Sequence, residues 1–281
     1  MGRQWGSPPR PRSAPGRGGL DGGRFAPAWG AEVVSSNIVG YHKISLSPGY
    51  NMIGTSFQTV GGDKEISVQD IKGSGLTGVD WTWETEAGDT LLIWDAANKA
   101  YLTTLYYTGD TATEEMTEEG AEPGTWFDLG DSYATSDYVF KNGDAFWVLS
   151  SGANATVTIA GEVPTETDSI SIVPGYNMIG NPYPKAVAVN DLFTITGLTG
   201  VDWTWETEAG DTLTIWDPVN KIYSTTLYWT GDTATPEMTE EGAEPATWFD
   251  LGDTYSTATT IIPVSGAFWI KSSGSGTLTF K

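Results

Sequence analysis

The distribution of hydrophobic and polar residues along the chain predicts short β-strands joined by turns. Apolar and polar residues alternate in TLLIWDAANKAYLTTLYY (90–107), which is typical of a hairpin with one buried face. ISLSPGYNMIG (44–54) predicts two strands around a Pro-Gly turn, and SVQDIKG (67–73) predicts one short helical turn. No apolar run approaches the 18 or so residues of a membrane-spanning helix. We therefore expect an all-β fold.

The same pattern occurs twice in the chain. SLSPGYNMIG (45–54) returns as SIVPGYNMIG (171–180), and GLTGVDWTWETEAGDTL at 75–91 is repeated without change at 197–213. Each copy has roughly the length of a small domain. Two long copies are also unlike a solenoid, which stacks several short repeats.

These copies predict two tandem, internally duplicated β-sandwich or open-barrel domains, at residues 32–162 and 163–281. We expect about seven short strands in each domain. The last two strands of each copy, AFWVLSS followed by ATVTIAG in the first, are expected to form a closing pair. Leu92 becomes Thr214 in the second copy, whereas Leu91 and Ile93 keep their residue types. Leu91 and Ile93 are therefore expected to point into the core.

Residues 1–31 differ from the rest of the chain. They are rich in Pro, Gly and Arg and cannot bury enough apolar surface to order themselves. Three interpretations stay open: a disordered arm, a wrongly assigned start joined to the remnant of a signal peptide, or an artefact of expression. FAPAWGA (25–31) is typical of the end of a signal peptide. We therefore favour cleavage near Ala31 and expect a secreted protein.

The distribution of charge along the chain limits the classes of binding partner that we expect. The formal net charge is −22, yet all five arginines lie in the first 24 residues, and the remainder has nine lysines against 35 acidic residues. Such an acidic body repels nucleic acid and anionic membranes, so we expect neither nucleic-acid binding nor membrane insertion. The absence of cysteine excludes disulfides and thiolate metal sites.

Three segments of the second copy resemble a known repeat. GYNMIGNPYP, LTIWDPVNKIY and GAFWIKSSGSGTLTF together are similar to the repeat domain of bacterial secreted and cell-surface proteins. The resemblance implies a small all-β module with an accessory, matrix or anchoring role outside the bacterial cell, without catalysis. The first copy reads GYNMIGTSF and lacks the Asn-Pro-Tyr-Pro of residues 181–184.

The alternating segment VDWTWETE places two tryptophans of each copy on one strand face. Two interpretations stay open: core or interface anchors, and platforms on which sugar rings stack. The candidate residues are Trp81, Trp83, Trp203 and Trp205.

The acidic segments that follow the hairpins make calcium a candidate cofactor, because calcium takes six to eight oxygen ligands. The alternative is a solvated acidic loop that favours solubility. No other cofactor is expected. The candidate calcium ligands are Asp110, Asp128, Asp131, Asp232, Asp250 and Asp253.

Catalysis is not expected. Glu84 and Glu86 stand side by side on one strand face, whereas glycoside hydrolysis needs two carboxyl groups across a bond. His42 is the single histidine and cannot form a transition-metal site alone, so we expect it to be a solvated residue of the first strand.

The segment EVVSSNIVG (32–40) has no counterpart in the second copy. It either pairs within its own domain or adds to an exposed sheet edge of a neighbouring molecule. Its candidate residues for assembly are Val33, Val34, Ile38 and Val39.

Two functions follow from these patterns. The first is a non-catalytic extracellular structural or adhesive protein, a homo-oligomer or polymer that forms a filament or matrix through edge strands and aromatic patches. The second is a polysaccharide-binding protein with duplicated tryptophan platforms.

Overall fold

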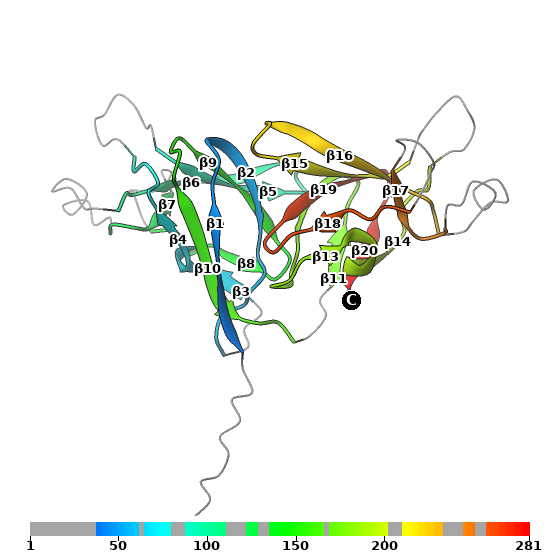
Figure 1. Cartoon of the computed structure of the whole chain (residues 1–281), viewed down its shortest axis with the longest axis horizontal. Helices are drawn as coiled ribbons and strands as arrows, with labels where there is room; N and C mark the ends of the chain where they lie inside the picture. The colour runs from blue at the N-terminus through cyan, green and yellow to red at the C-terminus, as the bar shows by residue number, and fades with distance from the viewer. Residues whose placement is uncertain are drawn as a thin grey trace, which may run out of the picture. The chain divides into compact units, whose positions relative to one another are not determined.

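The computed structural model describes residues 38–61, 65–79, 88–110, 122–128, 135–165, 169–201, 210–232, 244–250 and 257–281. These residues belong to one compact unit, Asn37–Lys281. They form short strands with two single helical turns (Figure 1), which confirms the all-β prediction. Within the described residues, no helix is long and apolar enough to cross a membrane.

The described residues of the first half form ten strands and one 3-10 turn. They are β1 (Val39–Ser45), β2 (Gly49–Gly54), β3 (Glu65–Ser67), η1 (Val68–Asp70), β4 (Ile71–Ser74), β5 (Thr90–Asp95), β6 (Ala100–Tyr107), β7 (Trp126–Asp128), β8 (Val139–Lys141), β9 (Ala145–Ser150) and β10 (Thr156–Glu162).

The second half follows the same order. Its elements are β11 (Ser169–Ile172), β12 (Gly175–Gly180), β13 (Val187–Ala188), α2 (Val189–Leu192), β14 (Phe193–Thr196), β15 (Thr212–Asp217), β16 (Ile222–Trp229), β17 (Trp248–Asp250), β18 (Ile261–Ile262), β19 (Ala267–Ser272) and β20 (Gly276–Phe280).

Each half has the same three sheets. A five-stranded sheet runs β2-β9-β5-β6-β7 in one half and β12-β19-β15-β16-β17 in the other. A three-stranded sheet, β1-β10-β4 or β11-β20-β14, accompanies it, with a two-stranded ladder, β3-β8 or β13-β18. One hydrophobic cluster per half takes residues from both larger sheets, as in a sandwich. The two clusters share no residue, so each half has its own core.

The pairing of neighbouring strands corrects one prediction. AFWVLSS and ATVTIAG do not pair with each other: β9 pairs with β2 and β5, whereas β10 pairs with β1 and β4. The turn between them carries the chain from one sheet to the other. The Pro-Gly turn after β1 does the same, whereas the β5–β6 hairpin pairs as predicted.

The strands are also more numerous than the seven predicted per copy. The additional strands are short elements of two or three residues, such as β3 and β13. An alternating pattern needs four or more residues to be recognised, so these elements carry no signal. The helical turns after the first sheet crossing are confirmed as η1 and α2.

The asparagine of GYNMIG, which both copies contain, has a structural role. Asn51 accepts a bond from the Ser47 backbone N–H at 2.8 Å and donates to the Ser47 and Gly49 carbonyls at 2.8 and 2.9 Å. Asn177 repeats these contacts in the second half. A side-chain amide is the group that can hold both faces of such a turn, because it both donates and accepts.

A buried carboxylate connects loop and strand backbones in each sandwich, in the Gly-Asp-Thr segments 88–90 and 210–212. Asp89 is 1% exposed and accepts bonds from the Thr77 and Ser151 backbone N–H groups at 3.0 and 2.8 Å. The hydroxyls of Ser150 and Ser151 donate to it as well. Asp211 repeats these contacts, except that its second serine donates only through the backbone.

We expect Asp89→Ala to lower the free energy of unfolding by about 3 kcal/mol, because it leaves buried N–H groups without an acceptor. Urea unfolding followed by tryptophan fluorescence measures this change. The control is Asp191→Ala, an exposed carboxylate on α2 that we expect to cost less than about 0.5 kcal/mol. Equal costs for the two variants would contradict the structural role of Asp89.

Candidate functional site

The two halves meet along a seam built on two glycines. A Cβ atom added to Gly54 would lie 2.6 Å from the Cα of Gly180, and the reverse distance is the same. The backbone N–H of Gly54 donates to the Ser265 carbonyl, and that of Gly180 donates to the Gly143 carbonyl, both at 2.8 Å. These contacts are reciprocal, as in an isologous interface between two subunits.

Polar side chains close one side of the seam. The Ser56 hydroxyl donates to the Asn181 carbonyl at 2.8 Å and accepts from the Ser265 backbone N–H at 2.9 Å. His42 reaches the Ser265 hydroxyl through Nδ1 at 3.1 Å, and partial burial lowers its pKa. The sequence predicts a solvated strand residue at position 42. His42 is instead half-buried at this junction, and its hydrogen-bond partner Ser265 comes from the other half.

A β-bulge directs one tryptophan of each half across the seam. The register of the β5–β6 pair shifts between Ile93 and Trp94, and that of the β15–β16 pair shifts at the equivalent step. Bulges commonly re-aim a side chain in this way. The Trp94 indole N–H donates to the Tyr176 carbonyl, and the Trp216 indole donates to the Tyr50 carbonyl, both at 2.8 Å.

These two tryptophans join six other aromatic rings. Trp94 packs edge-to-face on Trp269 with centroids 5.4 Å apart, and Trp216 packs on Trp147 at 5.6 Å. We call the whole set the seam aromatic surface. Its members are Tyr50, Trp94, Tyr101, Trp147, Tyr176, Trp216, Tyr223 and Trp269.

The seam aromatic surface presents its tyrosines to solvent. Tyr50, Tyr101, Tyr176 and Tyr223 are 46–51% exposed, while Trp147 and Trp269 beneath them are only 5–6% exposed. An exposed aromatic patch of this kind is uncommon on a monomer and marks an interaction surface.

The environment of Tyr101 and Tyr223 favours the neutral form of their hydroxyls. Partial burial raises the pKa of Tyr101, and the neighbouring Tyr223 and Tyr50 add to the rise, whereas the Trp147 indole opposes it. Burial raises the pKa of Tyr223 in the same way. Neutral phenols both donate and accept hydrogen bonds, so this surface can bind hydroxyl-rich ligands as well as apolar groups.

The hairpin tips frame the surface with charged groups. Asp95 accepts bonds from the Ala97 and Asn98 backbone N–H groups and from the Asn98 side chain, which holds its pKa below the usual range. Lys99 follows with φ 55° and lies over Gly175 of the other half. Asp217 and Lys221 repeat this arrangement over Gly49.

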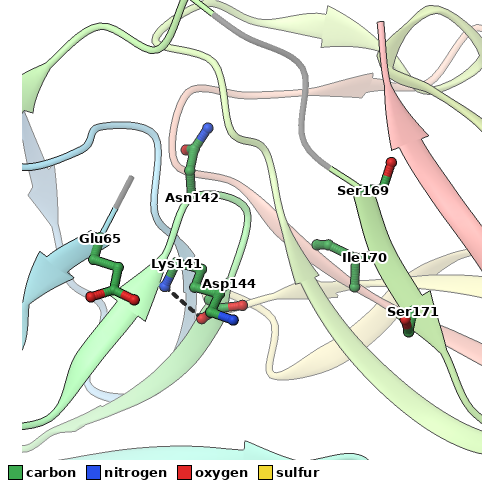
Figure 2. Close-up of a pocket in the computed structure, with 7 residues that line it drawn as sticks. All are labelled: Glu65, Lys141, Asn142, Asp144, Ser169, Ile170 and Ser171. Carbon is green, nitrogen blue, oxygen red and sulfur yellow. Dashed lines mark hydrogen bonds between the residues drawn. The ribbon is translucent and has the colours of Figure 1, made fainter. Parts of the chain in front are cut away.

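A separate pocket of about 470 Å³ opens between the halves (Figure 2). The end of β8 supplies Lys141, the turn that follows supplies Asn142 and Asp144, and β3 supplies Glu65. The opposite wall is β11, with Ser169, Ile170 and Ser171. In the second half, the residues equivalent to Lys-Asn-Gly-Asp (141–144) are Pro-Val-Ser-Gly (263–266), so this chemistry occurs only once.

Two polar groups in this region are removed from water without a full set of hydrogen-bond or charge partners among the described residues. The Asn142 side chain is 4% exposed, and its Oδ1 atom accepts no hydrogen bond from the residues that the structure describes. Burial raises the pKa of Asp144, although its carboxylate accepts a 2.7 Å bond from the Lys141 backbone N–H. Glu65, which pairs with Lys141 across the β3–β8 ladder, raises the pKa of Asp144 further.

The structure does not test whether the tryptophans of VDWTWETE form a platform for sugar rings. Trp81, Trp83, Trp203 and Trp205 all lie outside the described residues. The aromatic surface that the structure does show comes from the GYNMIG, IWD and AFW motifs. Their tryptophans and tyrosines recur in both copies, and this recurrence is a signal that could have marked them.

The predicted calcium ligands are only partly described. Asp131 and Asp253 lie outside the described residues. Asp110 accepts bonds from the Gly75 backbone N–H at 3.0 Å and the Tyr107 hydroxyl at 2.6 Å, so its carboxylate ties a loop to the core.

Asp128, Asp232 and Asp250 lie at the ends of strands or in adjoining turns. In the part of the chain that the structure describes, no three His, Cys, Asp or Glu residues gather as a metal site would require. Calcium binding stays a prediction.

Of the segment 32–40, which the sequence makes a candidate for assembly, the structure describes only the end, from Ile38 on. Val33 and Val34 precede the described residues. The Ile38 carbonyl accepts a bond from the Val163 N–H at 2.7 Å, and Val39 pairs with Glu162 of β10. Both side chains are exposed, at 69% and 60%. This stretch therefore pairs within its own half through one edge and leaves its side chains in solvent.

Comparison of the chain with protein-family models, with curated proteins and with solved structures found no significant match. The resemblance to repeats of bacterial secreted and surface proteins therefore stays a prediction.

We expect Gly54→Ala to lower the free energy of unfolding by about 2 kcal/mol or more, because its methyl group meets backbone atoms of the other half that cannot yield easily. Thermal and urea unfolding measure the loss. The control is Gly274→Ala, where the nearest atom to the new Cβ lies 3.5 Å away and φ is not in the left-handed region. A Gly54→Ala variant as stable as this control would show that the seam opens freely.

Proposed function

We propose that this protein is a non-catalytic structural or adhesive protein that acts outside the bacterial cell and associates with further copies of itself. The observation that carries the proposal is strand β1. It lies at the edge of its sheet, where β10 is its one strand partner among the described residues. It has seven residues, whereas the equivalent β11 has four.

The exposed side chains of this edge support strand addition. Ile38, Val39 and Tyr41 are 69%, 60% and 73% exposed, and Lys43 is the single charged residue in β1 that could discourage pairing. A long edge strand with apolar side chains is a template for pairing with another chain. The acidic body keeps such an assembly soluble and favours ordered contacts over general aggregation.

We expect the protein to form larger particles as its concentration rises, and we expect Val39→Lys combined with Tyr41→Lys to shift it towards monomers. The two charges repel their counterparts in a neighbouring strand. Light scattering after size-exclusion chromatography, together with negative-stain microscopy, measures particle size.

The control for this experiment is Val60→Lys, which adds a charge at a 59% exposed apolar residue outside any strand. A wild-type chain that remains monomeric at all concentrations would rule out self-assembly. Equal particle sizes for the β1 variant and the wild type would rule out strand addition alone.

A second candidate function is polysaccharide binding, which the seam aromatic surface favours. Its four half-exposed tyrosines offer ring faces and hydroxyls together, and both halves contribute. Aromatic rings of this kind can lie against the apolar faces of sugars while the hydroxyls form hydrogen bonds.

If this second function holds, we expect Tyr101→Ala combined with Tyr223→Ala to weaken binding of a soluble polysaccharide about tenfold, since each ring contributes about 0.5–1.5 kcal/mol. Calorimetry and the intrinsic tryptophan fluorescence of the protein follow the titration. Tyr41→Ala removes an exposed tyrosine away from the seam and serves as the control. Loss of binding in the control alone would place the polysaccharide elsewhere.

A further inference from the structure

The seam aromatic surface lies on elements that both halves supply. Its four tyrosines belong to β2, β6, β12 and β16 (Figure 1), and each is 46–51% exposed. The hairpins β5–β6 and β15–β16 expose further apolar side chains near their tips, at 55%, 74% and 55%: Leu102, Val219 and Ile222. A partner that covers these groups removes apolar area from water, which stabilises the complex.

The charge of this surface differs from that of the protein as a whole. The hairpins and strands that carry its rings contain three lysines and two acidic residues: Lys99, Lys221, Lys271, Asp95 and Asp217. The chain after residue 24 has nine lysines against 35 acidic residues. Two copies therefore repel each other through their net charge, whereas this surface adds nothing to that repulsion.

Each half contributes an equivalent set of groups to this surface. Trp94 and Trp216 each donate to a carbonyl of the other half, and Lys99 and Lys221 each lie over a glycine of the other half. Each hairpin tip thus offers one lysine and one aspartate close to exposed rings. A second copy that meets this surface with its own can set lysines against aspartates, which is the self-complementarity that an isologous contact requires.

We propose that the seam aromatic surface of one molecule docks against the seam aromatic surface of a second copy. The inference rests on the proposed self-association and adds a second contact to it. Aromatic rings supply the apolar area, as they commonly do at the centre of an interface, and the balanced charges suit the close approach of two acidic molecules. Strand β1 belongs to the three-stranded sheet and the seam strands to the five-stranded sheets, so one molecule presents both contacts.

Two different contacts on each molecule let an assembly grow beyond a dimer. An isologous contact closes once two molecules have met, because each has then used the surface in question. Antiparallel pairing of one β1 with the β1 of a neighbour would therefore stop at a dimer. With the seam contact, each β1-linked dimer still presents two seam surfaces, through which it joins further dimers.

A polysaccharide is the other occupant that the exposed tyrosines admit. It can stack on the rings and form hydrogen bonds with the hydroxyls. A neutral polysaccharide, however, makes no use of the lysines and aspartates at the hairpin tips. A second copy uses both the rings and the charges, so the observations favour a second copy.

The experiment compares the particle mass of full-chain variants over a rising concentration series. The β1 variant, Val39→Lys with Tyr41→Lys, blocks strand addition. The seam variant, Lys99→Glu with Lys221→Glu, makes the seam aromatic surface acidic and leaves its rings in place. A combined variant carries all four substitutions. Analytical ultracentrifugation measures the mass, and urea unfolding shows that each variant is folded.

We expect the wild type to grow past the dimer and the β1 variant to stop at a dimer. We expect the seam variant to stop at the β1-linked dimer at concentrations where the wild type grows. The combined variant should dimerise at least about tenfold more weakly than the β1 variant, because each substitution occurs twice in an isologous contact.

The matched control is Lys72→Glu with Lys185→Glu in the β1 variant, which makes the same change in net charge at two exposed lysines outside the seam aromatic surface. We expect this control to dimerise as tightly as the β1 variant. Tyr101→Ala with Tyr223→Ala, also in the β1 variant, removes rings instead of charges and should weaken the dimer by a similar factor. It decides the matter if the lysine substitutions disturb the hairpin tips.

The outcomes separate the two contacts. A β1 variant that stays monomeric while the wild type grows would overturn the seam contact and leave strand addition standing. A dimer in both the wild type and the β1 variant, lost in the seam variant, would support the seam contact and overturn strand addition.

Two further results would also overturn the seam contact. One is equal dimer affinity for the combined variant and the control. The other is a monomeric β1 variant that binds a soluble polysaccharide and loses this binding on Tyr101→Ala with Tyr223→Ala, which would assign the surface to the second candidate function. A wild type that never exceeds the monomer would overturn self-association altogether.

Discussion

The close approach of Gly54 to Gly180 is the constraint on which the arrangement of this protein depends. Only residues without a Cβ atom allow the two backbones to approach this closely. The approach brings each hairpin within reach of the other half, so Trp94 and Trp216 can donate to carbonyls across the seam. The seam aromatic surface and the polar pocket are both consequences of the same contact.

Some residues of the repeated motifs stabilise each sandwich, and others form the contact between the two halves. Asn51 and Asp89, with their counterparts Asn177 and Asp211, satisfy backbone groups inside each sandwich. The tryptophans of IWD and AFW instead pack between the sandwiches. The identical sequence in the two copies therefore has two structural roles, one inside each half and one in their mutual contact.

Much of the fold could be predicted from the alternation of residues. The hairpin over 90–107 and the inward direction of Leu91 and Ile93 follow from period-two patterns, and the burial of both residues confirms them. The assignment of β9 and β10 to different sheets could not be predicted, because alternation identifies a strand but not its partner. The seam was missed for a related reason: a tryptophan that contacts another half looks, in sequence, like one that fills its own core.

Covalent connection of the two halves has a consequence for their chemistry. An interface between identical subunits must accept every substitution twice, whereas a linked pair holds its partner at high local concentration and can change one side alone. The turn that reads Lys-Asn-Gly-Asp in one half and Pro-Val-Ser-Gly in the other is such an asymmetric change. A single chain with two equivalent halves can thus keep a symmetric scaffold while the sequence of one of two equivalent turns changes.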